Sequence, residues 1–173
     1  PNTLIDLGCN DGDYSKLSLD SGAKYVVGFD FDHNTIANAF KMAKDDEDNF
    51  LPLILDASNP SPNQGWLQKE RKGFIERFHA DALIALAFEH HLIIGKNVPI
   101  QQFVEWITSI SECGLIEFVP KTDKTIQKML EYRDDIFSNY TEEEFENCLK
   151  EKSNIINKNT ITKSGRIIYE YKI

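Results

Sequence analysis

Apolar runs of strand length alternate with stretches of helical spacing along most of the chain. The predicted strands are Thr3–Leu7, Tyr25–Asp30, Phe50–Leu55, Asp81–Ala87 and Leu115–Val119. The predicted helices between and after them are Tyr14–Ser21, His33–Lys44, Phe74–Phe78, Pro99–Ile110, Lys124–Tyr132 and Glu142–Lys150. Strands that alternate with helices predict an α/β fold, in which a parallel sheet carries helices on both faces.

Two runs of alternating apolar and polar residues close the chain, at Asn154–Ile161 and Arg166–Tyr171. Ser164 and Gly165 provide a turn between them, so the pattern predicts an antiparallel hairpin. No internal repeat or low-complexity linker interrupts the 173 residues. We therefore expect one domain that spans residues 1–173.

A glycine-bearing loop follows the first predicted strand. It reads Asp6-Leu7-Gly8-Cys9-Asn10-Asp11-Gly12. The two glycines allow a sharp turn and a close approach to a ligand, but the spacing differs from the dinucleotide fingerprint G-x-G-x-x-G. Acidic side chains at Asp6 and Asp11 suit a cationic sulfonium and an ammonium group better than a diphosphate. The alternative is an ordinary strand-to-helix turn that happens to contain two glycines.

Acidic residues also stand at the ends of the second and third predicted strands. Asp30 comes about 20 residues after the loop, where an acid can accept hydrogen bonds from both ribose hydroxyls. Asp32 is better placed to cap the next helix, and Phe31 could lie against an adenine face. Asp56 and the N–H of Ala57 could bind the adenine edge, or Asp56 could serve only the turn. Acids at the ends of successive strands predict a nucleoside-binding site.

The composition narrows the classes of partner. The net charge is −9 and the isoelectric point about 4.9, so we expect no nucleic-acid partner, because an acidic surface repels phosphates. No apolar run approaches the ~20 residues that span a bilayer, so we also expect no membrane partner. Three widely spaced cysteines without a C-x-x-C pair indicate reduced thiols and a cytoplasmic protein.

Taken together, these residues resemble the class I S-adenosylmethionine-dependent methyltransferases. Leu4–Gly12 resembles the first motif of that family, and Val26–Asp30 resembles its acidic second strand. Leu53–Ala57 resembles its adenine-side loop. Further segments resemble a narrower bacterial group of nodulation-protein-like methyltransferases. These segments are Asn59–Pro62 with Gly65-Trp66, Ala85–Leu92, Asn97–Pro99, Ile116–Lys121, Arg133–Phe137 and Ser164–Arg166. The resemblance covers nearly the whole chain.

The resemblance implies a Rossmann-like three-layer sandwich, whose mostly parallel seven-stranded sheet has an antiparallel last strand. It implies S-adenosyl-L-methionine as the cofactor and methyl transfer to a small-molecule or biosynthetic-intermediate acceptor. The implied cofactor contacts, with Asp6 from the loop, are Gly8, Asn10, Gly12, Asp30, Phe31, Asp56, Ala57 and Leu86. Trp66 lies in a loop beside the expected adenine side and could form part of a lid. Since the family has helices before its first motif, we expect an N-terminal segment or a partner to complete the pocket.

Candidate catalytic groups follow the fourth and fifth predicted strands. A histidine at His90 or His91 could remove a proton from the methyl acceptor, since its pKa suits neutral pH. Glu89 and Glu117 could also face the pocket. Alternatively, one histidine packs in the core and the other bonds to backbone, so that neither is catalytic. Glu117 could likewise be a pairing acid for the nearby Lys121. We expect no metal site, because no third ligand has suitable spacing.

Other functions remain open at this point. One alternative is a non-catalytic module that keeps the fold and binds the cofactor or a partner protein. Another is an aminopropyl transferase, which would need several acids in its pocket. A nicotinamide oxidoreductase is disfavoured by the missing G-x-G-x-x-G. Similarity of fold alone does not separate these classes.

Overall fold

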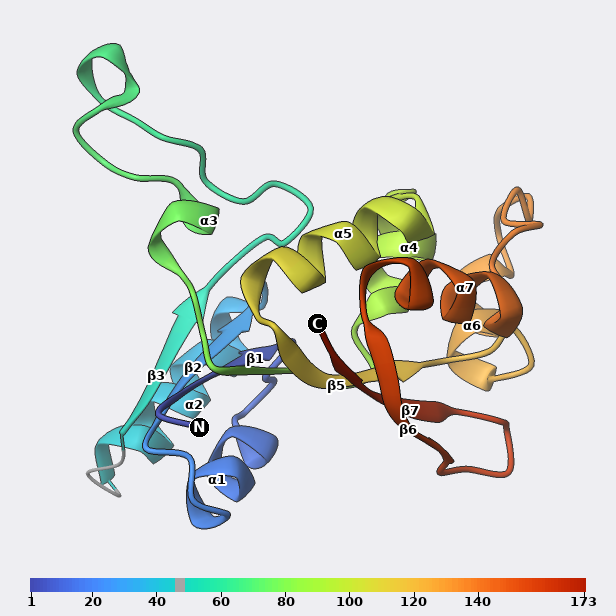
Figure 1. The fold of residues 1–173 in the computed structure, drawn as a ribbon, viewed down its shortest axis with the longest axis horizontal. Coiled ribbons are helices and arrows are strands. Elements are labelled where there is room, and N and C mark those ends of the chain that lie inside the picture. Colours follow the sequence, from blue (N-terminus) through green and yellow to red (C-terminus); the bar gives the residue numbers. More distant parts are fainter. Residues whose placement is uncertain (46–48) are drawn as a thin grey trace. The chain divides into compact units, whose positions relative to one another are not determined.

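The computed structural model describes residues 1–45 and 49–173. It contains a seven-stranded sheet with the strand order β3-β2-β1-β4-β5-β7-β6 (Figure 1). The strands are β1 (Thr3–Leu7), β2 (Tyr25–Asp30), β3 (Phe50–Ile54), β4 (Ala82–Ala85), β5 (Cys113–Phe118), β6 (Asn154–Thr160) and β7 (Ile167–Lys172). The chain divides into two compact units, residues 1–84 and 85–173.

The first unit is a parallel sheet with helices. β1 pairs in parallel with β2 and with β4, and β2 pairs in parallel with β3. The helices are α1 (Asp13–Asp20), α2 (His33–Asp45) and the short α3 (Phe74–Arg77), with a 3-10 turn, η1, at Trp66–Gln68. Ile5, Leu7 and Val26 are buried strand residues of this core. The cap predicted for α2 is confirmed, because the Asp32 carboxylate accepts the N–H groups of residues 34 and 35 at 2.7 and 3.2 Å.

The second unit contains the predicted terminal hairpin. β7 pairs antiparallel with both β5 and β6, which confirms the hairpin and the antiparallel strand. The helices are α4 (Glu89–Lys96), α5 (Ile100–Ile110), α6 (Lys124–Leu130) and α7 (Glu142–Lys152). Thr141 caps α7, since its hydroxyl accepts the Glu144 N–H at 3.2 Å. Phe145 is fully buried and contacts the rings of Phe118 and Tyr169, at centroid distances of 5.2 and 5.6 Å.

Two features differ from the sequence prediction. Helix α4 was not predicted, because Glu89–Lys96 buries side chains around most of its circumference and so lacks a simple amphipathic period. β5 begins at Cys113, two residues before the predicted strand, and most other boundaries shift by one or two residues. The expectation of a single domain over residues 1–173 stays a prediction. Within the described residues, no helix is long and apolar enough to cross a bilayer.

Candidate functional site

The glycine loop folds tightly against the end of β2. The N–H groups of Gly8 and Cys9 both donate to the Phe29 carbonyl, at 2.7 and 3.0 Å. The Gly12 N–H then donates to the Cys9 carbonyl at 2.9 Å. Gly8, Asn10 and Gly12 have φ angles of 77°, 49° and 99°, in the left-handed region that favours glycine and tolerates asparagine. The sequence therefore sets the loop's conformation at three alternate positions.

The carboxylate of Asp30 is held from two sides by backbone. Its Oδ2 accepts the Asn10 N–H at 3.1 Å, and its Oδ1 accepts the Asp32 N–H at 3.0 Å. Asp30 is only half-buried, and each carboxylate oxygen can accept a second hydrogen bond. The side chain thus has a fixed direction and spare acceptor capacity beside the loop. This geometry is what a pair of vicinal hydroxyls would require.

Asp6 lies beneath the loop, inside the unit. Its side chain is 2% exposed, and the Ser15 hydroxyl donates to its Oδ2 at 2.6 Å. Burial raises the pKa of Asp6 to about 6; the bond from Ser15 lowers it, and the charge of Asp30 raises it further. Asp6 therefore ties the end of β1 to the start of α1. The predicted contact of Asp6 with a cofactor stays a prediction.

The other first-unit candidates lie at the ends of β2 and β3. Asp56 Oδ1 accepts the N–H and the hydroxyl of Ser58, at 3.0 and 2.6 Å, so Asp56 stabilises the turn that follows β3. Ala57 lies within that turn and is half-buried. Phe31, directly after Asp30, is 69% exposed. The end of β2 thus carries a fixed carboxylate and, as the next residue in the chain, an exposed aromatic ring.

In the second unit, the backbone directly after β4 is held in a strained conformation. Ala87 has a φ of 49°, which costs roughly 1–2 kcal/mol for a residue with a Cβ. Its N–H donates to Glu117 Oε2 at 2.9 Å, and Glu117 is 5% exposed. Leu86, the predicted backbone contact, precedes it and is half-buried. Non-glycine strain of this kind concentrates at functional sites.

Arg166 connects two buried carboxylates, and sequence reasoning missed this role. Its Nε and one terminal nitrogen donate to Asp123 at 2.7 and 3.0 Å, and the other terminal nitrogen donates to Glu117 Oε1 at 3.2 Å. The bond from Arg166 holds the pKa of Asp123 well below its usual range. The same bond raises the pKa of Arg166, and the charge of Glu117 raises it further. The predicted alternative, Glu117 paired with Lys121, is wrong, because Lys121 bonds Asp135 at 2.7 Å.

Glu89 and His90 are buried and bonded within the second unit. Glu89 Oε1 accepts the Val119 N–H at 2.7 Å and the Tyr140 hydroxyl at 2.8 Å. Its Oε2 lies 3.3 Å from His90 Nδ1, and His90 is 1% exposed. Burial raises the pKa of the Tyr140 hydroxyl, and the neighbouring Glu89 raises it further. The burial of His90 fits the alternative of a core position for one histidine, and Glu89 ties α4 to Val119 and Tyr140.

His91 is the exposed member of the four catalytic candidates. Its ring lies against that of His90, with centroids 4.2 Å apart. Within residues 1–45 and 49–173, no group of three or more histidine, cysteine or acidic side chains could hold a metal ion. The catalytic roles of Glu89, His90, His91 and Glu117 stay predictions.

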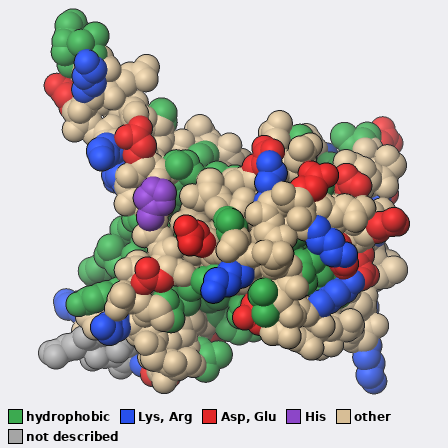
Figure 2. Space-filling model, viewed as in Figure 1, with side chains coloured by type: hydrophobic (Ala, Val, Ile, Leu, Met, Phe, Trp, Pro, Cys, Tyr) green, Lys and Arg blue, Asp and Glu red, His purple; other side chains and the backbone are tan. Residues whose placement is uncertain are grey.

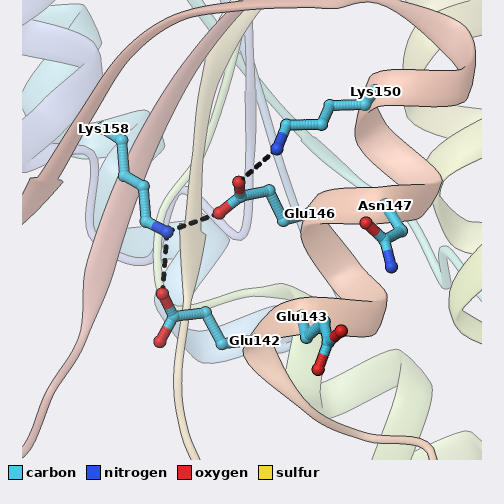
Figure 3. A pocket seen from close by; sticks show the side chains of 6 residues that line it. All are labelled: Glu142, Glu143, Glu146, Asn147, Lys150 and Lys158. Carbon is cyan, nitrogen blue, oxygen red and sulfur yellow. Dashed lines mark hydrogen bonds and ion pairs between the residues drawn. The ribbon is translucent and has the colours of Figure 1, made fainter.

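A shallow depression of the second unit is lined by α7 and β6 (Figure 3). Its lining residues are Glu142, Glu143, Glu146, Asn147, Lys150 and Lys158. Lys158 bridges Glu142 and Glu146, and Lys150 bonds Glu146 at 2.6 Å. The bonds from Lys150 and Lys158 lower the pKa of Glu146 to about 2. Both lysines of the lining are ion-paired with its glutamates, so the depression is a surface ion-pair network and not a candidate site.

The comparison with curated proteins gives one relative of high similarity. The chain is 51% identical over 172 residues to nodulation protein NoeA of Rhizobium meliloti (strain 1021). The match covers 99% of the chain and 36% of the relative, so the chain spans about a third of that protein's length. No protein-family profile matches the chain.

Several solved structures with the same fold are methyltransferases. The bifunctional kinase-methyltransferase WbdD matches with a TM-score of 0.65 at 16% identity, over 99% of this chain and 35% of that one. Magnesium protoporphyrin IX methyltransferase (ChlM) from Synechocystis PCC 6803, solved with bound SAM, matches with a TM-score of 0.61 at 17% identity. That match covers 98% of this chain and 68% of ChlM. The chain has the class I methyltransferase fold. The predicted fold class and family resemblance are thereby confirmed.

The exclusion of nucleic-acid partners is wrong for this methyltransferase fold. An rRNA methylase from Escherichia coli matches with a TM-score of 0.65 at 14% identity, over 99% of this chain and 57% of that one. The 16S rRNA methylase RmtB also shares the fold. The prediction failed because net charge is a sum over the whole surface, whereas a nucleic acid contacts only one part of it.

Proposed function

We propose that this methyltransferase-fold chain binds S-adenosyl-L-methionine and transfers its methyl group to a small-molecule acceptor. The observation that carries the proposal is the Asp30 carboxylate. Backbone N–H groups of Asn10 and Asp32 hold it at the end of β2, half-exposed and with acceptor capacity left. Preorganised acceptors of this kind bind paired hydroxyls without a cost of reorganisation.

The residues of the first unit fit the parts of this cofactor. In the proposal, Asp30 accepts the ribose hydroxyls, and the exposed ring of Phe31 covers one face of the adenine. The loop residues Gly8, Asn10 and Gly12 bring backbone close to the amino-acid end, in conformations that favour glycine or asparagine. In the same proposal, Asp56 and Ala57 make the remaining contacts of this unit. The bound cofactor would supply a methyl group already activated by the sulfonium.

The protein's own task in such a transfer is to orient the acceptor and to remove its proton where necessary. His91 is the candidate base that the geometry favours, because it is exposed while Glu89 and His90 are buried. In the proposal, Glu117 acts on the backbone, since it accepts the N–H of the strained Ala87. It positions the segment after β4 and does not itself take a proton.

Calorimetric titration of the cofactor into the purified chain tests the proposal. Asp30→Asn should weaken binding at least about tenfold, because it replaces a charged acceptor of two hydroxyls with an amide. Asp32→Asn is the matched control: it removes a neighbouring exposed charge but keeps a side chain that caps α2. This control should bind as the wild type does. Equal affinities of wild type and Asp30→Asn, or preferential binding of NAD, would refute the proposed site.

One observation favours a second candidate, a non-catalytic module that binds the same cofactor. Of the four proposed catalytic groups, Glu89, His90 and Glu117 are buried, and each is hydrogen-bonded or ion-paired. Methyl-labelled cofactor incubated with a cell extract separates the two functions. Label in the small-molecule fraction that is lost with His91→Ala supports the transferase. Cofactor binding without any transfer of label supports the module, and label in RNA would redirect the acceptor class.

A further inference from the structure

A hairpin arm, residues 61–73, projects from the first unit (Figure 1). Gln64 and Arg71 pair across it, with N–H to carbonyl distances of 2.8 and 3.1 Å in the two directions. At its base, Asn63 Oδ1 accepts the Gly73 N–H at 2.5 Å. Phe74, the next residue, is buried, with its ring 5.4 Å from that of Phe29. The arm is therefore a hydrogen-bonded element whose base is anchored in the core.

The tip of the arm presents two adjacent large apolar side chains. Trp66 is 77% exposed and Leu67 is 66% exposed. The turn that carries them uses left-handed backbone at Gly65, Leu67 and Gln68, with φ angles of 81°, 53° and 58°. For leucine and glutamine this conformation is unfavourable. Strained backbone that presents exposed apolar side chains indicates a contact surface.

The charge of the arm differs in sign from that of the chain. Residues 64–73 contain three basic residues, Lys69, Arg71 and Lys72, and one acidic residue, Glu70, which gives a net charge of 3 − 1 = +2. The whole chain carries −9. All four side chains are exposed, and Figure 2 shows hydrophobic side chains at the end of the arm with basic ones beside them. An apolar tip flanked by cations is complementary to a surface of anionic lipid headgroups.

We propose that the arm docks on the surface of an anionic membrane. Trp66 and Leu67 enter the headgroup region, and the three basic residues bind lipid phosphates. Nucleic acid fits less well, because Leu67 has no planar face to stack on a base and Trp66 is the single aromatic residue of residues 64–73. Such contact needs no spanning helix. The sequence predicts no membrane partner, but that prediction rests only on the lack of a spanning segment. The proposed docking therefore departs from it.

Vesicle co-sedimentation and tryptophan fluorescence test the docking of the full chain. Phosphatidylglycerol vesicles should sediment the protein and shift its tryptophan emission to the blue, whereas phosphatidylcholine vesicles should do neither. Trp66→Phe should still sediment but lose the shift, since the other tryptophan, Trp106, lies in α5 of the second unit. No sedimentation of the wild type with phosphatidylglycerol would overturn the proposal.

Paired variants show whether the arm makes the contact. The double change Trp66→Ser with Leu67→Ser should weaken partitioning at least about tenfold. Lys69→Glu with Lys72→Glu should weaken it by a similar factor, and added salt should weaken the wild type likewise. Tyr132→Ser is the control, because that side chain is 91% exposed but lies outside the arm. Unchanged binding of the tip variant with native circular dichroism would overturn the proposal, as would Trp66-dependent binding to oligonucleotides but not to vesicles.

Discussion

Replacing Arg166 with methionine should destabilise the second unit strongly. The guanidinium donates two bonds to Asp123 and one to Glu117, whose side chains are 8% and 7% exposed. Arg166→Met keeps much of the aliphatic stem but leaves both carboxylates buried without a cation. Breaking a buried ion pair costs about 3–5 kcal/mol. The Arg166 side chain is itself 22% exposed, so we expect the lower end, about 3 kcal/mol.

The matched control is an ion pair of the same unit that is more exposed. Lys121 bonds both oxygens of Asp135 at 2.8 and 2.7 Å, but the two side chains are 30% and 45% exposed. Lys121→Met should therefore cost less than about 1 kcal/mol. Urea unfolding at neutral pH, followed by circular dichroism, gives both free energies. A cost for Arg166→Met no larger than that of Lys121→Met would refute the reasoning.

The pH dependence provides a second check on the same pair. The pKa of Asp123 is lowered in the folded chain from its ordinary value of 3.8. A lowered carboxyl pKa contributes stability that is present above pH 3.8 and is lost as the pH falls towards the folded value. Since that contribution depends on Arg166, the difference between wild type and Arg166→Met should narrow below about pH 4. A difference that stays constant into strong acid would assign the loss to packing instead.

Two further predictions concern the first unit. Gly12→Ala should cost about 3 kcal/mol, because φ is 99° and the new Cβ would lie 2.7 Å from both Met42 and Phe50. Gly22→Ala, with a φ of 105° and nothing within 4 Å, should cost only about 1–2 kcal/mol, and equal costs in urea unfolding would contradict this. Asp6 has a raised pKa of about 6, so its contribution to stability is full below pH 3.8 and is lost as the pH rises through 6. The wild type should therefore lose up to about 3 kcal/mol of unfolding free energy between pH 4 and 7, and Asp6→Asn should not. A decrease with pH that persists in this variant would disprove the assignment.

Local patterns predicted the first unit well. Strand β2 and the start of α2 match the expectation, because a short apolar run and a capping acid are local signals. The availability of Asp30 could also be anticipated, since Asp32 takes the capping role, whereas the bond from the Asn10 N–H that fixes its direction could not. The burial of Asp6 could not, because it depends on the hydroxyl of Ser15 on the following helix.

The second unit was harder to predict, because its polar contacts join residues far apart in sequence. Arg166 lies 43 residues from Asp123 and 49 from Glu117. These contacts become visible only once the antiparallel register of β5 and β7 places Ile167 opposite Phe118. The segment Ser164–Arg166 resembles the nodulation group, but that resemblance does not indicate what the arginine contacts. Long-range pairing therefore decided which acidic residues have buried partners.

The energetically unfavourable features of the second unit lie at or just after the carboxyl ends of β4 and β5. Ligands of open α/β sheets bind at such strand ends. Ala87, two residues after β4, has an unfavourable φ. The acids Glu89, Glu117 and Asp123, which lie at or after the ends of β4 and β5, are buried. Buried ion pairs can often be replaced by apolar residues without loss of stability, so stability alone does not explain them. Glu117 instead fixes the Ala87 N–H, and Arg166 fixes Glu117. In the proposed function, this costly but well-defined arrangement would hold the segment after β4 in position for the methyl acceptor.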